Sequence, residues 1–149
     1  MTQAVVHAHV VVKEPRGDLM FIRRVRHGRV YYITPGSVTR EAETPGTAAA
    51  RVAAELLGVA ITIDEMLYAE VFAGIDHFFF LATAKELPTV DHVGSGQGHD
   101  DFELDTELEG TYEVVRLPIG TILAHDVRPR RLALRIAHQS PASRDYAIP

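Results

Sequence analysis

The residues best suited to chemistry lie in one stretch, where two carboxylates flank an arginine at regular spacing. Glu43 stands just before a helical pattern, and Arg51 and Glu55 are one helical turn apart within it. Clustered carboxylates are the natural ligands of hard cations such as Mg²⁺ and Mn²⁺. Glu43 and Glu55 are therefore candidate ligands for a divalent cation.

A capped helix is predicted to position these side chains. Thr44 is a good N-cap, Pro45 fits the first helical position, and Gly58 follows as the C-terminal cap residue. The segment from Thr47 to Leu57 is rich in alanine and leucine and contains no proline. We expect a helix that starts at Thr44 or Pro45, ends at Gly58 and packs one face on a sheet: Ala49, Val52, Ala53 and Leu56.

The stretch from Gly36 to Val59, called the box below, resembles the Nudix box, the signature of the Nudix hydrolase family. Glu43, Arg51 and Glu55 stand at positions of that pattern, and Gly58-Val59 match its close. In the family, glutamates on this helix hold divalent metals. Here Glu55 is one of them, whereas Val52 and Leu56 stand where the pattern has the other two.

The resemblance implies an α/β fold, a Nudix-like α/β/α sandwich with a mixed, mostly antiparallel sheet. It covers residues 1–138 as one domain and leaves 139–149 as a tail. It also implies metal-dependent cleavage of the pyrophosphate bond in nucleoside-diphosphate-linked substrates, with Mg²⁺ or Mn²⁺ as cofactor. Glu55 and Arg51 would be the catalytic residues, and the metal ligands would be Glu55, Glu43 and, from an acidic segment, Asp100 and Asp101.

The substrate would be a small nucleotide-type molecule that binds beside the box. Ser37 stands where the pattern has its first glycine, with Gly36 next to it, and both are predicted to bind substrate. Nudix proteins commonly place a phosphate-binding arginine near Arg23 or Arg24. These two arginines point to opposite faces of their predicted strand, so one of them can face the site. Nothing in the sequence names the base or the sugar.

Two other functions stay open. Because Val52 and Leu56 replace box glutamates, the chain could be a Nudix-fold module that binds a nucleotide or a protein without cleaving it. A third hypothesis is a histidine-assisted metal site that uses His7 and His9 with acidic residues elsewhere, since the two histidines share one face of a predicted strand.

Composition limits the partners and the cellular location that we expect for this protein. The net charge of −5 gives no general nucleic-acid patch, and no apolar run approaches the length of a membrane span. The absence of cysteine excludes disulfides and fits a reducing cytoplasm. No signal peptide is recognisable, so we expect a cytoplasmic protein, with a homodimer left open.

The rest of the chain reads as alternating strands and turns. We expect strands at Ala4–Lys13, Leu19–Val25, Arg29–Thr34, within Val59–Phe72, at His77–Ala84, central in the sheet, and at Thr111–Leu117. A long acidic loop should span Lys85–Glu109, and a last helix Arg128–His138.

Overall fold

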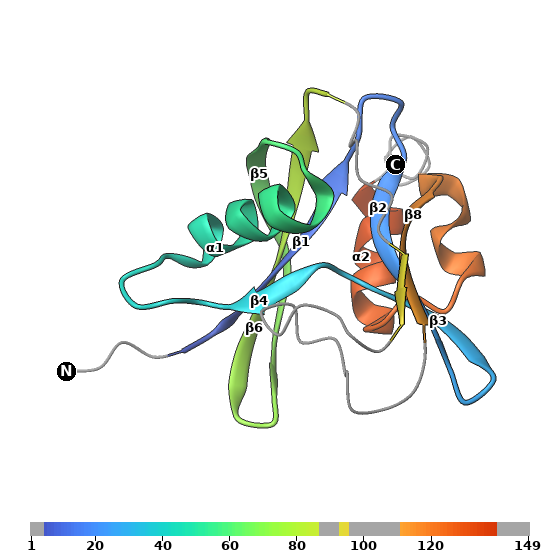
Figure 1. The fold of residues 1–149 in the computed structure, drawn as a ribbon, viewed down its shortest axis with the longest axis horizontal. Helices are drawn as coiled ribbons and strands as arrows, with labels where there is room; N and C mark the ends of the chain where they lie inside the picture. The colour runs from blue at the N-terminus through green and yellow to red at the C-terminus, as the bar shows by residue number, and fades with distance from the viewer. Residues whose placement is uncertain (1–4, 87–92, 96–110, 140–149) are drawn as a thin grey trace, which may run out of the picture.

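The computed structural model describes residues 5–86, 93–95 and 111–139, and the strands within them form one eight-stranded sheet (Figure 1). The main path runs in the order β5-β6-β1-β2-β8-β7, with β3 paired to β2 and β4 paired to β1. The strands are β1 (His7–Lys13), β2 (Leu19–Arg26), β3 (Arg29–Ile33), β4 (Gly36–Val38), β5 (Ile61–Phe72), β6 (Ile75–Ala84), β7 (Val93–Ser95) and β8 (Thr111–Leu117).

The sheet is mixed and mostly antiparallel, as predicted. β1 and β6 pair in parallel, with His7 opposite His77, whereas the other named strand pairs are antiparallel. β6 is an internal strand, as predicted for His77–Ala84, because it pairs with β5 on one side and with β1 on the other. Its apolar side chains pack on both faces of the sheet.

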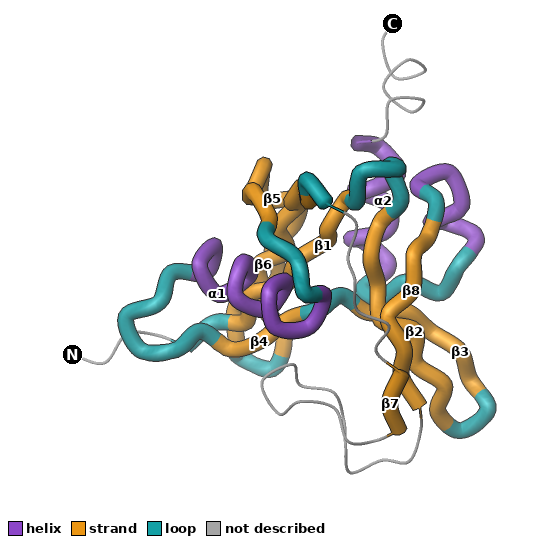
Figure 2. The backbone as a smooth tube through the Cα atoms, turned by 45° about the horizontal axis from the view of Figure 1, so that its top comes forward, coloured by secondary structure: helices purple, strands orange, loops and turns teal. Residues whose placement is uncertain are grey.

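Helices cover both faces. On one face α1 (Pro45–Val52) continues into a π-helical turn, η1 (Ala53–Leu57), that ends at Gly58. On the other lie the 3-10 helix η3 (Ile119–Ala124) and α2 (Arg130–Gln139). Figures 1 and 2 show α1 well separated from α2, with the strands running between and beside them. The predicted α/β/α sandwich is therefore present.

Strand alternation divides the buried side chains into two clusters, one for each face. Ala8 and Val10 of β1 pack under α1, together with Ala49, Val52, Ala53 and Leu56 of the helix, as predicted. Val11 points the other way and packs with α2 residues, which include Leu132 and Ile136. Each helix is thus held by its apolar stripe against a different face of the same strands.

Some boundaries differ from the sequence predictions. β1 begins at His7 rather than at Ala4, Gly36–Val38 forms the short strand β4, which was not predicted, and β7 lies within the segment predicted to be a loop. The short helix η3 was not predicted, because six residues with a glycine among them are too few for a helical period to be recognised. The predicted tail lies outside the described residues except Gln139, which ends α2. None of the helices in the described ranges is long and apolar enough to cross a membrane.

Candidate active site at the box helix

The entrance of the box helix is fixed by local hydrogen bonds. Thr44 has an extended backbone, and its hydroxyl oxygen accepts a hydrogen bond from the Thr47 N–H at 3.1 Å, as an N-cap should. Just before it, the Arg40 N–H donates to Glu43 Oε1 at 2.9 Å, and the Glu43 N–H donates to the Arg40 carbonyl at 3.0 Å. The loop therefore presents the Glu43 carboxylate toward α1.

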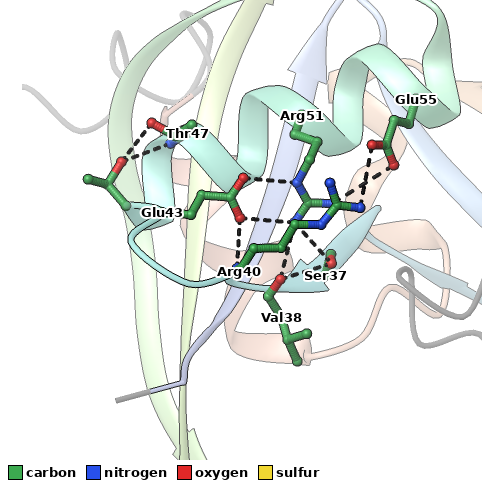
Figure 3. Close-up of polar contacts among 8 residues, drawn as sticks. Ser37, Val38, Arg40, Glu43, Thr47, Arg51 and Glu55 are labelled. Atoms are coloured by element: carbon green, nitrogen blue, oxygen red, sulfur yellow. Dashed lines mark hydrogen bonds and ion pairs between the residues drawn. The ribbon is translucent and has the colours of Figure 1, made fainter. Parts of the chain in front are cut away.

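Arg51 joins the helix to this loop and to β4 (Figure 3). Its Nε–H donates to Glu43 Oε2 at 2.9 Å, and its terminal nitrogen donates to Glu43 Oε1 at 3.0 Å and to the Val38 carbonyl at 3.2 Å. The two side chains are only 12% and 11% exposed. The hydrogen bond from Arg51 lowers the pKa of Glu43, so this carboxylate is ionised at neutral pH. The pair is a bidentate clamp.

Glu55 lies in the π-helical turn and is more open to solvent, with its side chain 41% exposed. One carboxylate oxygen is 3.8 Å from Arg51, and the other is 3.8 Å from Arg40. Glu55 thus stands between two guanidinium groups. The four charged groups shown in Figure 3, two arginines and two glutamates, balance to zero.

Val52 and Leu56 occupy the positions of the two missing box glutamates, and both are 0% exposed. They belong to the hydrophobic cluster between α1 and the sheet. The π-helical turn contributes to this packing: within it Leu56 and Leu57 are both buried, whereas Ala54 and Glu55 face outward. Aliphatic side chains therefore fill the space beneath the helix where the family carries carboxylates.

The described donor set does not fit a Mg²⁺ or Mn²⁺ site. Both oxygens of Glu43 accept hydrogen bonds from Arg51 or from the backbone. Glu55 offers one accessible carboxylate, but two arginines stand beside it and would repel a cation. Hard cations need several oxygen ligands. The predicted ligands Asp100 and Asp101 lie outside the described residues.

The two candidate arginines of β2 do lie on opposite faces. Arg24 alternates with Met20 and Ile22 of the α1-side cluster and is itself 1% exposed. Arg23 lies on the α2 side, where it pairs with Glu113 at 3.4 Å. Of the two, Arg24 therefore shares a face of the sheet with the box helix.

Gly36 and Ser37 also point to different faces. Ser37 is buried on the α1 side, and its hydroxyl oxygen is 3.4 Å from the Arg51 nitrogen. At Gly36 a Cβ atom would come within 2.4 Å of the His9 ring, so glycine is required there by the imidazole. The structure therefore brings Ser37, Glu43, Arg51 and Glu55 together and leaves Gly36 with His9.

A basic pocket at the β2–β3 hairpin was missed in the sequence. It has a volume of about 470 Å³ and is lined by Arg26, His27, Arg29, Tyr31 and Arg128. Arg26 pairs with Arg29 and Arg24 with Tyr31, so these four side chains share the α1 face of the strands. Arg128 comes from the segment beside β3 and covers the Tyr31 ring at 4.2 Å. The feature of the sequence that could have indicated this pocket is the alternation of arginines along β2, where Arg24 and Arg26 fall on one face.

Comparisons with solved structures find the same fold in Nudix proteins. A MutT structure from work on the Aliivibrio salmonicida and Vibrio cholerae proteins aligns with a TM-score of 0.66 and 12% identity, over 93% of this chain and 100% of the other. A NUDIX hydrolase from Nitrosomonas europaea aligns with a TM-score of 0.58 and 17% identity, over 90% and 86%. MutT protein from Methanosarcina mazei Go1 gives 0.57 and 12%, over 93% and 96%.

No protein-family model matches the sequence, and no curated protein matches it either. The resemblance is therefore carried by the three-dimensional structure and by the partial box. The chain has the Nudix fold, as its sequence predicted.

Proposed function

We propose that this Nudix-fold chain binds a small nucleotide-type ligand through its phosphates and does not cleave it at the box. The observation that carries the proposal is the burial of Val52 and Leu56 at 0% exposure. Because these side chains form part of the core beneath α1, the helix has no room there for a metal-binding carboxylate. The loop and helix of the box are retained as a structural frame, held by the Glu43–Arg51 clamp.

The cationic α1 face supports a phosphate-bearing ligand. The pocket at the β2–β3 hairpin gathers Arg26, Arg29 and Arg128 in a protein whose net charge is −5. Asp126 pairs with Arg128 at 2.9 Å and offsets one of these charges. Arg29 is exposed in the pocket, and its guanidinium fork favours phosphate oxygens in particular.

Calorimetric titration with ADP and ADP-ribose, without metal, tests the binding. We expect saturable binding that Arg29→Ala weakens at least fivefold, since Arg29 is an exposed wall of the pocket. Arg16→Ala is the matched control, because Arg16 is exposed in the turn between β1 and β2. Absence of saturable binding, or equal weakening by the two substitutions, would overturn the proposal.

A Nudix-type pyrophosphohydrolase is the second candidate, and the exposure of Glu55 favours it. That carboxylate lies on the outer side of an otherwise complete loop–helix frame. A Mg²⁺ or Mn²⁺ ion would then depend mainly on the phosphates of the substrate, because Glu55 is the more accessible of the two glutamates that match the box pattern. Metal-dependent turnover that Glu55→Gln abolishes would favour this candidate.

The setting proposed here is the one that the sequence predicts: a cytoplasmic protein acting on a small molecule. Neither nucleic acid nor a membrane is included as a partner. Light scattering on the purified protein tests whether the chain forms a homodimer. A mass near 32.8 kDa, twice that of the 16.4 kDa chain, would indicate a dimer.

A further inference from the structure

Three histidines converge on the face of the sheet opposite the box helix. His7 and His9 come from β1 and His77 from β6, and the parallel register places His7 beside His77. One ring nitrogen from each lies within 4.8 Å of the others. The ring centroids of His7 and His77 are 4.4 Å apart, and His9 Nε2 is 3.0 Å from His77 Nδ1. This cluster is the one group with metal-binding geometry among the residues that the structure describes.

The cluster is separate from the box. His7 and His9 alternate along β1 with Ala8 and Val10, which pack under α1, so the imidazoles lie on the α2 side. The next residue on their side, Val11, belongs to the cluster that packs against α2. A ligand at the histidines would therefore contact neither Glu43 nor Glu55.

The ring of His9 is held in one orientation. Its Nδ1 is 3.1 Å from the Thr34 hydroxyl, and its ring stacks on Phe79 with centroids 4.2 Å apart and planes tilted by 11°. On another side Gly36 leaves only the space that the ring fills. In the tautomer in which Nδ1–H donates to the Thr34 hydroxyl oxygen, the Nε2 lone pair is directed at His77. Metal-binding histidines are commonly oriented by such a hydrogen bond from the second nitrogen.

The same surroundings disfavour the charged form of two of the rings. Burial lowers the pKa of His7, and burial together with the neighbouring His77 and His7 lowers the pKa of His9 to about 3. The neutral imidazole is the form that coordinates a metal.

We propose that His7, His9 and His77 form a binding site for a divalent transition-metal ion, with Zn²⁺ as the best fit. Three nitrogen ligands suit zinc, copper or nickel, whereas Mg²⁺ and Mn²⁺ prefer oxygen. Zinc–nitrogen bonds of about 2.0 Å require ligand nitrogens roughly 3.3 Å apart in a tetrahedral site. On binding, the 3.0 Å contact between His9 and His77 would open slightly, and the wider spacings, up to 4.8 Å, would close by rotation of the His7 and His77 rings. A water molecule would complete the tetrahedron.

The bound ion would join β1 to β6. These strands are parallel neighbours, and their residues His9 and His77 lie 68 positions apart in the sequence. An ion held by both strands stabilises the folded chain over the unfolded one, because the unfolded chain does not hold the three ligands together. The site extends beyond the proposed nucleotide binding and does not depend on it.

The test is titration of the untagged, metal-free protein with ZnCl₂ by calorimetry and with CoCl₂ by visible absorption. We expect one ion per chain, the intense visible bands of four-coordinate cobalt, and a higher melting temperature with zinc. His77→Gln and, separately, His7→Gln should each weaken zinc binding at least tenfold. His125→Gln is the matched control, since His125 lies on the same side of the sheet against Tyr32 and outside the cluster.

A third variant probes the orientation of the ring. Thr34→Val should weaken zinc binding about tenfold while leaving the stoichiometry at one, because it removes the hydrogen bond to His9 Nδ1. Circular dichroism checks that each variant is folded. The proposal is overturned if zinc does not saturate a single site. It is also overturned if His77→Gln binds zinc as tightly as the control variant His125→Gln and the wild type do. Glu55→Gln should leave zinc binding unchanged, which separates this site from the box.

Discussion

Restoring a box glutamate at Leu56 should destabilise the protein strongly rather than restore a metal site. The leucine is 0% exposed beneath the helix, so Leu56→Glu places a carboxylate in an apolar cluster. An uncompensated buried charge costs about 3–5 kcal/mol. That is a large share of the 5–15 kcal/mol by which domains of this kind are usually stable, in rough terms.

Urea unfolding followed by circular dichroism measures this cost. With a slope of about 2 kcal/mol per molar urea, the midpoint should fall by about 2 M. Ala54→Glu is the matched control, because Ala54 is exposed two residues away on the same turn, and its midpoint should barely move. Leu56→Met keeps the apolar character and should cost less than about 1.5 kcal/mol.

The opposite result would refute the reasoning. If Leu56→Glu is as stable as Ala54→Glu and gains magnesium-dependent hydrolysis, Leu56 borders a cleft, and the box is a decayed active site. A stable but inactive Leu56→Glu variant would also contradict the packing argument, since the charge would then have reached solvent.

Three further predictions concern the clamp and the histidines. Arg51→Lys loses the bidentate contact with Glu43 and should cost about 2 kcal/mol in urea unfolding, more than a surface ion pair; a loss below about 0.5 kcal/mol would contradict it. Because the pKa of His9 is about 3 when folded and about 6.5 when unfolded, the unfolded chain takes up the proton first. Stability should then fall as the pH drops below 6.5, by up to about 1.4 kcal/mol per pH unit, and His9→Gln should flatten this slope. Gly36→Ala should cost about 1–3 kcal/mol through overlap with His9, and adding His9→Ala should recover most of the loss; equal stability of the single and double variants would refute the contact.

The local rules of helix formation account for what the sequence predicted well. The N-cap at Thr44, the proline at the first position and the glycine at the end act within a few residues, so they can be read directly. The same helical period placed Val52 and Leu56 on the inner face. The π-helical form of the last turn escaped prediction, because it depends on how both Leu56 and Leu57 pack on the sheet.

Contacts between distant strands account for what could not be predicted. Alternation showed that Arg23 and Arg24 face opposite ways, but only the pairing of β2 with β3 and β8 decides which one shares the face of the box helix. The role of His77 likewise follows from the parallel pairing of β1 with β6, which no local pattern reveals. Sequence spacing thus found two members of the histidine cluster and missed the third.

Phosphorus NMR of nucleotides mixed with the protein and Mg²⁺ tests the central claim most directly, because one sample reports both binding and cleavage. With ADP-ribose as the probe, we expect the pyrophosphate signals to shift or broaden saturably. Arg29→Ala should reduce that effect, and no product signal should appear beyond the protein-free control. New phosphate-monoester signals that grow with wild-type protein and vanish with Glu55→Gln would contradict the account, and the box would then be an active site.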